Sequence, residues 1–350
     1  MKSFYIGKNR IGYGCPPYII AEAGINHNGD ISIAKQMINV AKEVGADAIK
    51  FQTFSAKEFI QDSSLKITYK SQGKEITESM LEMFERCEFS KSEWQELKGH
   101  CQEVGITFLS TPQNITDLDF LLSLGIDAIK VGSDDFTNIP LLKYYSSKKK
   151  PMLVSCGMAS ADEIDYTVEL IRSNGNDMVL FLCTSQYPTE PENVNINRLI
   201  TMKEKYSDIV LGLSDHSVGN EAAVMAVALG AKVFEKHFTL SHDFEGPDHW
   251  FSEEPDKLRE WVISIKRAYL MTGTSKIGLT DAEKDTRIIA HRSITTRNRI
   301  NKGEQITEDN ICLRRPGTGL EPKMWDKVIG KIASRDLLEG YQIKLSDLEE

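Results

Sequence analysis

Length, composition and charge exclude several classes of protein. The chain has 350 residues, of which 41% are hydrophobic and 27% charged, which is typical of a globular protein with a sizeable core. Its formal charge of −9 argues against nucleic acid or an anionic membrane as the main partner. The six cysteines form no C-x-x-C pair, and the longest apolar runs are too short to cross a bilayer. We therefore expect a cytoplasmic protein with reduced thiols, built from one large domain and a small appendage.

A recurring phrase, glycine followed by a short apolar run, marks three predicted strands. It occurs at 45–53 (GADAIKFQT), 125–133 (GIDAIKVGS) and 230–238 (GAKVFEKHF). Glycine readily takes the left-handed conformation that ends a helix, so each phrase predicts a helix end followed by a buried strand. Further apolar segments raise the number of predicted strands to eight; they are 18–24, 106–111, 151–156, 178–183 and 209–214.

Amphipathic segments separate most of these strands and predict helices, for example at 31–44, 91–104, 160–173 and 193–206. Alternating helices and apolar strands indicate a parallel sheet that is buried on both faces. Eight such units within about 250 residues favour a closed (β/α)8 TIM barrel. A doubly wound open sheet is the alternative, but no G-x-G-x-x-G motif opens a helix in this sequence.

Two regions depart from this regular alternation. An insertion at about 54–89 lies between the second and third strands, and it is either a lid over the active face or a helix pair without such a role. After residue 285 the sequence changes to short β-like pieces separated by turn residues, as in NKGE and RPGTG. We therefore predict a barrel over 1–275, a linker over 276–287 and a small β-rich domain over 288–350.

Charged and polar side chains gather at the carboxyl ends of the predicted strands, where barrel enzymes have their active sites. His216 and His237 end the seventh and eighth strands, which are neighbours in a barrel. Their imidazoles predict a site for a divalent ion of the Mn²⁺ type, with water, substrate oxygens or a carboxylate completing the shell. The alternative is an ordinary pair of hydrogen-bonded histidines. His27, His242 and His249 lie in loops and are weaker metal candidates.

Lys50 and Lys130 end two other strands, and buried ammonium groups are costly unless an anion or a carboxylate accompanies them. Hydroxyl groups end neighbouring strands, so the lysines and hydroxyls together predict a cradle for phosphate or carboxylate. Two alternatives remain open: a Schiff-base lysine, and structural pairing with Glu22 or Glu235. The hydroxyl-bearing residues are Thr111, Ser133, Ser155, Ser185 and Ser214.

With these residues in place, the sequence resembles the sialic acid synthase family, whose members are N-acetylneuraminate synthase-like transferases. The motifs that carry the resemblance occur in family order over nearly the whole chain, and the C-terminal module is similar to the antifreeze-like, or SAF, domain with its β-clip fold. They are AEAGINHNGD (21–30), IKFQTF (49–54), STP (110–112), KVGSDD (130–135), SCGM (155–158), CTSQYP (183–188), GLSDHS (212–217), EKHFT (235–239), GPDH (246–249) and RRPGTG (314–319).

The resemblance implies that phosphoenolpyruvate condenses with the open-chain aldehyde of N-acetylmannosamine, with C–O cleavage, to give N-acetylneuraminate and phosphate. It implies a Mn²⁺-type ion on His216 and His237, with Mg²⁺ or Co²⁺ as substitutes, and a domain-swapped homodimer. Glu22, Lys50, Lys130 and His237 would be catalytic. Phosphoenolpyruvate would be held by Lys50, Thr111, Lys130, Ser133, Ser155, Ser185 and Ser214, and the sugar by Gln52, Asp135, Tyr187, Asp248 and Arg315, the last from a second subunit.

Departures from the family pattern leave the sugar open, among them Asp134 and Asp135 in KVGSDD and the bulky Trp250 after GPDH. The runner-up substrate is a 2,4-diacetamido-6-deoxymannose, which would give a legionaminic-type acid. Two alternatives come from other classes of function. One is a metal-dependent aldolase that uses pyruvate, and the other is a sugar-binding protein without catalysis.

Overall fold

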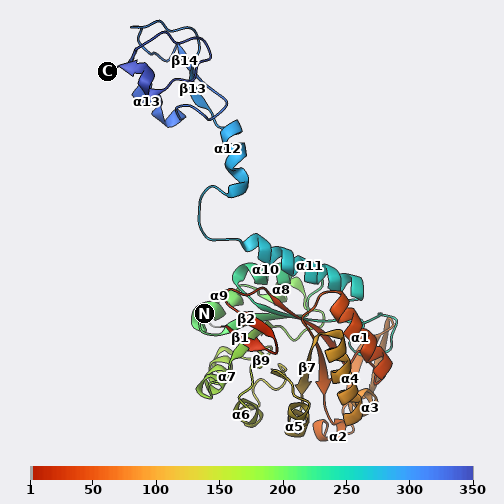
Figure 1. Cartoon of the computed structure of the whole chain (residues 1–350). Helices are drawn as coiled ribbons and strands as arrows, with labels where there is room; N and C mark the ends of the chain where they lie inside the picture. Colours follow the sequence, from red (N-terminus) through yellow and green to blue (C-terminus); the bar gives the residue numbers. More distant parts are fainter. Residues whose placement is uncertain (1–2, 350) are drawn as a thin grey trace. The chain divides into compact units, whose positions relative to one another are not determined.

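The computed structural model describes residues 3–349, which divide between Gly273 and Thr274 into two compact units (Figure 1). Eight parallel strands of the first unit form one sheet in the order β7-β4-β3-β12-β11-β10-β9-β8. β7 and β8, at the two ends of this order, also lie against each other, so the sheet curls into a nearly closed barrel. The strands are β3 (Tyr18–Gly24), β4 (Ala48–Thr53), β7 (Thr107–Pro112), β8 (Ile129–Val131), β9 (Met152–Ser155), β10 (Met178–Cys183), β11 (Val210–Asp215) and β12 (Val233–His237).

The predicted TIM barrel is therefore confirmed, and each of the eight predicted strands is present. Helices follow the strands and cover the outside of the barrel (Figure 1). They are α1 (Ile31–Glu43), α4 (Lys91–Val104), α5 (Ile115–Ser123), α6 (Ile139–Ser147), α7 (Ala161–Ser173), α8 (Pro191–Val194), α9 (Arg198–Lys205), α10 (Glu221–Leu229) and α11 (Pro255–Thr272).

Local signals in the sequence explain where several of these helices begin and end. Ser90 begins α4 with a capping box, and Gly105 ends it in the left-handed conformation at φ 75°. The single helix expected over 193–206 is instead two helices, α8 and α9. Asn195 takes a left-handed φ of 49° and breaks the helical path between them.

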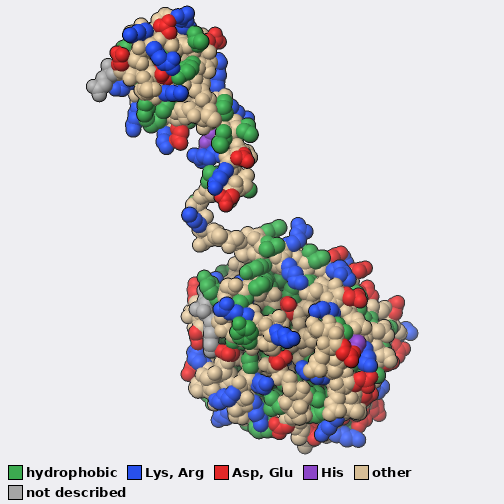
Figure 2. All heavy atoms as spheres, in the orientation of Figure 1, with side chains coloured by type: hydrophobic (Ala, Val, Ile, Leu, Met, Phe, Trp, Pro, Cys, Tyr) green, Lys and Arg blue, Asp and Glu red, His purple; other side chains and the backbone are tan. Residues whose placement is uncertain are grey.

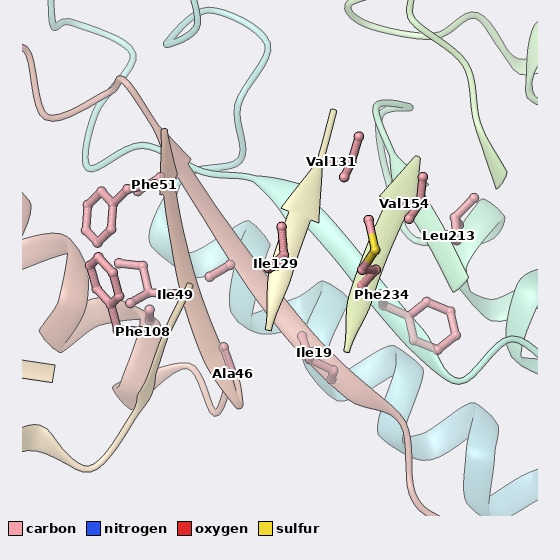
Figure 3. Packing of buried hydrophobic residues seen from close by; sticks show 14 of the residues in the cluster. Ile19, Ala46, Ile49, Phe51, Phe108, Ile129, Val131, Val154, Leu213 and Phe234 are labelled. Carbon is pink, nitrogen blue, oxygen red and sulfur yellow. The ribbon is translucent and has the colours of Figure 1, made fainter. Parts of the chain in front are cut away.

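Two layers of apolar side chains hold the barrel together. The outer layer packs the strands against the helices, and the stacked rings of Phe51 and Phe108 form part of it (Figure 3). The inner layer fills the barrel below the strand ends. An N-terminal hairpin, β1 (Ser3–Ile6) and β2 (Asn9–Gly12), adds Phe4, Ile6 and Ile11 to this layer, so it plugs the amino-terminal end of the barrel. The sequence analysis did not predict this hairpin.

The insertion at 54–89 contains a short helix α2 (Ala56–Phe59), an antiparallel hairpin of β5 (Lys66–Ser71) and β6 (Lys74–Ser79), and α3 (Met80–Cys87). It is therefore more than a helix pair. Ile25, Phe54, Met83 and Cys87 form a small apolar cluster that joins α3 to the loops following β3 and β4. This anchoring keeps the insertion on the active face of the barrel.

The second unit is a small β-rich domain with its own apolar core, centred on Ile294, Ile306, Ile311 and Leu337. A connecting segment with η1 (Asp281–Glu283) and α12 (Lys284–Ala290) precedes it. Its elements are β13 (Ser293–Thr296), β14 (Ile311–Arg314), η2 (Pro322–Met324), α13 (Trp325–Val328), β15 (Ile332–Ala333), η3 (Leu345–Asp347) and β16 (Leu348–Glu349).

The surface carries charges of both signs. Figure 2 shows lysines and arginines interspersed with aspartates and glutamates over the face of the barrel unit that is in view. Among residues 3–349, no helix is long and apolar enough to span a membrane.

Candidate active site

Strand alternation brings the predicted site residues to one mouth of the barrel. Glu22 is level with Lys50 on β4 and with His237 on β12, and Ser214 is level with Glu235. Because these residues face inward at the carboxyl ends of neighbouring strands, they surround a cavity of about 400 Å³. The predicted residues that line it are Glu22, Lys50, Gln52, Thr111, Lys130, Ser133, Ser155, Ser185, Tyr187, Ser214, His216 and His237.

Two lysines and two glutamates form the charged base of this cavity, and each of the four is less than 5% exposed. The Lys50 ammonium lies 2.8 Å from Glu22 Oε1 and 3.7 Å from Glu235 Oε1. The Lys130 ammonium lies 3.8 Å from Glu235 Oε1, so this carboxylate is shared by both lysines. The pairing that was weighed as a structural alternative is therefore present within the cavity itself.

The environments of the two glutamates separate their proton affinities. Burial raises the pKa of Glu22 to about 7, although the Lys50 ammonium opposes this shift. Burial also disfavours ionisation of Glu235, but Lys130 and Lys50 outweigh it and hold the pKa of Glu235 below its usual value. Near neutral pH, Glu235 is thus a fixed anion, while Glu22 can gain or lose a proton.

Hydroxyl groups are placed within reach of the lysines. Lys50 Nζ donates to Thr111 Oγ1 at 3.0 Å, and Lys130 Nζ donates to Ser155 Oγ at 2.8 Å. The buried hydroxyl oxygen of Ser185 has no hydrogen-bond partner among the described residues. The wall of the cavity therefore carries many ammonium and hydroxyl groups that can donate hydrogen bonds to an anion.

An aromatic ring lies next to Lys130 at the base of the cavity. The Lys130 ammonium is 5.5 Å from the centre of the Phe181 ring, which belongs to the inner apolar layer. Gly212 makes room for this ring, because a Cβ at position 212 would lie 2.6 Å from Phe181 Cδ1. The glycine in GLSDHS thus lets a large ring close the base of the cavity.

The two histidines lie side by side, with ring centres 5.5 Å apart. His216 Nδ1 is 2.8 Å from the carbonyl oxygen of Thr184, which makes Nδ1 the donor. Burial lowers the pKa of His216, but Cys183 and the Thr184 carbonyl outweigh it and hold this pKa above its usual value. The buried Nδ1 of His237 has no hydrogen-bond partner among residues 3–349. Burial and the neighbouring His216 keep the pKa of His237 well below its usual value, so its ring is neutral.

A second cavity of about 580 Å³ continues outward from the first, and Gln52, Phe84, Tyr187 and His237 line both. Its walls combine apolar rings with a few polar groups, as is typical of a site for a small organic molecule. The remaining lining residues come from the loop after β3, from the insertion and from the segment after β12; they are Ile25, Ile67, Thr68, Tyr69, Lys70, Glu75, Met83, Pro247, Asp248, Trp250 and Phe251.

Most of the predicted sugar contacts lie where the two cavities meet or in the outer one, but two do not. Asp135 lines neither cavity; its carboxylate accepts from Asn138 Nδ2 at 2.9 Å, and the neighbouring Asp134 lines the inner cavity instead. Arg315 belongs to the second unit, so its contact with a sugar remains a prediction.

Some lining residues were not among the predicted site residues. Glu235 had been placed at the same strand ends but only as a structural partner, and its sharing by two lysines needs the three-dimensional register. Cys183 ends β10 and accepts from Ser133 Oγ at 3.4 Å. Lys70 lies 4.9 Å from the centre of the Trp250 ring, which joins the hairpin to the segment after β12. No local motif indicates this last contact.

The loop histidines make structural contacts. His249 bonds through Nδ1 to Thr239 Oγ1 at 2.7 Å and through Nε2 to Asn28 Oδ1 at 3.1 Å. His27 is stacked on Phe89, with ring centres 4.2 Å apart, and burial lowers the pKa of His27 to about 3. Neither histidine lines the two cavities.

Comparison with known proteins identifies the family of this chain. Residues 37–277 match the NeuB family, and residues 291–349 match the SAF domain. An N,N'-diacetyllegionaminic acid synthase of Legionella pneumophila is 35% identical, over 98% of this chain and 100% of its own. The human N-acetylneuraminate-9-phosphate synthase is 34% identical, over 87% of this chain and 84% of its own.

A solved structure gives the same result. The N-acetylneuraminic acid synthetase of Leptospira borgpetersenii aligns with a TM-score of 0.73 and 32% identity, covering 81% of this chain and 95% of that one. The family match covers more than half of the chain, and both relatives align over most of their length. The chain therefore belongs to the NeuB family of sialic and related nonulosonic acid synthases.

Proposed function

We propose that this protein condenses phosphoenolpyruvate with a 2-acetamido mannose-type sugar in its open-chain form, giving a nonulosonic acid and phosphate. The observation that carries the proposal is the pair of joined cavities. The inner one has two buried ammonium groups and a ring of hydroxyl donors, which suits a small anion. The outer one is larger and partly apolar, which suits an acetamido sugar.

The residues of the inner cavity have separate tasks in this scheme. Lys50 and Lys130, with the hydroxyls beside them, hold phosphoenolpyruvate and stabilise negative charge as phosphate leaves. Glu235 lies beside both lysines, and its carboxylate opposes the lowering of the Lys130 pKa by burial. Glu22, with its pKa raised to about 7, is suited to exchange a proton with water or a sugar hydroxyl at neutral pH.

The histidine pair has the donor chemistry for a divalent ion. His237 Nδ1 is buried and unpaired, and the His216 ring, whose Nδ1 bonds to the Thr184 carbonyl, lies beside it. The Asp248 carboxylate lies 4.0 Å from His237 Nδ1, yet among the described residues no group of three or more acidic, thiol or imidazole side chains forms a complete metal cage. We propose that His216 and His237 hold a Mn²⁺-type ion with positions open to substrate. Such an ion would supply Lewis-acid polarisation of the sugar aldehyde.

N-acetylmannosamine is the first substrate to test. A 2,4-diacetamido-6-deoxymannose is the second candidate, and the apolar walls of the outer cavity favour it. Trp250, Phe251 and Met83 line that cavity and could contact a methyl or an acetamido methyl group. The Legionella relative carries the name of a legionaminic acid synthase.

The test is phosphate release from phosphoenolpyruvate in the presence of Mn²⁺ with each sugar in turn. Release that depends on one of the two sugars and on the metal supports the proposal and names the product. Turnover of pyruvate with the same sugars, without any release of phosphate from phosphoenolpyruvate, would contradict it and favour the aldolase alternative.

A further inference from the structure

A buried polar cluster lies behind the two histidines, on the outer side of β11 and β12. Asp215 and Lys236 immediately precede His216 and His237 in sequence, so their side chains point away from the cavity and toward the helix layer. Both are only 3% exposed. Apolar side chains such as Leu213, Phe234 and Trp261 otherwise occupy this layer (Figure 3 shows the first two).

Lys236 connects two strand ends through its ammonium group. Its Nζ lies 3.0 Å from Asp215 Oδ2 and donates to the carbonyl oxygens of Ser217 at 2.5 Å and Gly219 at 3.3 Å. The segment 215–219 contains His216. One lysine of β12 thus contacts the side chain of the residue before His216 and the backbone of the residues after it.

Asp215 is held equally firmly. Its Oδ1 accepts from the backbone nitrogen of Ser217 at 3.0 Å and from the Ser217 hydroxyl at 2.6 Å. Its Oδ2 accepts from Trp261 Nε1 of α11 at 3.0 Å. The indole therefore fixes the carboxylate that pairs with Lys236.

A third segment joins the same cluster. Glu253 Oε1 lies 3.6 Å from Lys236 Nζ, and the backbone nitrogen of Glu253 donates to the carbonyl oxygen of His237 at 2.9 Å. Asp248, which lies opposite His237 in the outer cavity, precedes Glu253 in this segment. Lys236 thus contacts every chain segment that brings His216, His237 or Asp248 to the site.

Stability alone is a weak reason for such a cluster. A buried ion pair costs several kcal/mol of desolvation per ion, and apolar replacement of the whole pair is often neutral or stabilising. The surrounding layer is apolar and could have packed over two apolar side chains. The contacts instead fix the segments that flank the two histidines, 215–219 and Glu253, and groups that hold the surroundings of metal ligands orient those ligands.

We propose that Lys236 is a positioning residue that sets the separation and orientation of His216 and His237 for a divalent ion. It acts by clamping the 215–219 backbone and Glu253 to β12, with Asp215 and Trp261 holding it in place. The inference rests on the proposed function only in requiring that the two histidines bind the ion.

The experiment is a titration of the purified full-length chain with Mn²⁺, in which free Mn²⁺ is read by electron paramagnetic resonance. Lys236→Met keeps most of the side-chain volume and removes the clamp, and it should raise the Kd for Mn²⁺ by about 10- to 100-fold. The matched control is Lys205→Met. The Lys205 ammonium also pairs with an aspartate, Asp165, at 2.6 Å. It lies 5.7 Å from the centre of the Tyr206 ring, and the Lys236 ammonium lies at the same distance from the Trp261 ring. The control should keep the wild-type Kd.

A purely structural role would lower the melting temperature of metal-free Lys236→Met without changing its Kd, and an unchanged Kd overturns the inference. If the wild-type chain binds no Mn²⁺, the assignment of the histidines as metal ligands is wrong, and the inference about Lys236 is wrong as well. These two failures are therefore distinguishable.

If Lys236→Met does not fold, Trp261→Phe replaces it, because that change keeps an aromatic ring in the layer and removes the indole donor to Asp215. A several-fold rise in Kd supports the clamp, and an unchanged Kd overturns it.

Discussion

Lys130→Met tests whether the two lysines bind the anion, because methionine keeps an aliphatic side chain against the Phe181 ring and removes one of the two ammonium groups. With both lysines present, the four charged side chains at the base of the cavity balance when Glu22 is ionised; without Lys130 they carry a net negative charge. A hydrogen bond to a charged group contributes about 1.5–3 kcal/mol, and a unit charge pair at 4 Å about 4 kcal/mol at an effective dielectric constant of 20.

We therefore expect the loss of transition-state stabilisation to be about 2–4 kcal/mol, so that kcat/KM for phosphoenolpyruvate falls roughly 30- to 900-fold. Initial-rate assays of phosphate release measure this, with circular dichroism to confirm the fold. Lys148→Met is the control, since Lys148 lies over the Tyr144 ring and 3.3 Å from Asp119, outside both cavities. A loss of less than threefold in Lys130→Met, with the fold intact, would refute the assignment of Lys130 to the anion.

Three further predictions concern the same barrel. Phosphoenolpyruvate binding should weaken as the pH rises through about 7, because Glu22 ionises there and cancels one lysine charge. Calorimetric titrations from pH 6 to 8.5 should show this fall in affinity, and Glu22→Gln should make the affinity less dependent on pH. Gly212→Ala should lower the free energy of unfolding by about 1–3 kcal/mol, since its Cβ would meet the Phe181 ring. The control, Gly99→Ala in α4, should not destabilise the chain, and urea denaturation measures the free energy of unfolding of both variants. His216→Ala should abolish Mn²⁺-dependent turnover, and retention of that dependence would contradict its role as a ligand.

The sequence predicts the barrel well because its signals are local. The glycine-plus-apolar phrases at 45–53, 125–133 and 230–238 each lead into a strand, and alternation along those strands determines which residues share a face. Lys50, Lys130 and His237 could therefore be assigned to one mouth before any coordinates. The parallel register then places Glu22 level with Lys50 and with His237.

The missing parts depend on contacts between distant segments. The β1–β2 hairpin buries Phe4, Ile6 and Ile11 against the inner layer of the barrel, and residues 3–12 alone do not show which surface they cover. The choice between Asp134 and Asp135 depends on the short loop after β8, where Asn138 takes the second carboxylate. The contact of Lys70 with Trp250 joins residues 180 positions apart, so only the fold shows that they share a cavity.

The most direct test of the central claim follows the bridging oxygen of phosphoenolpyruvate. Substrate labelled with ¹⁸O at that position is turned over with Mn²⁺ and the sugar that supports phosphate release, and the phosphate is examined by ³¹P nuclear magnetic resonance. The account predicts that a nonulosonic acid forms and that the label leaves with phosphate, because the C–O bond breaks. Label retained in the sugar acid, or equal product from pyruvate in place of phosphoenolpyruvate, would contradict it.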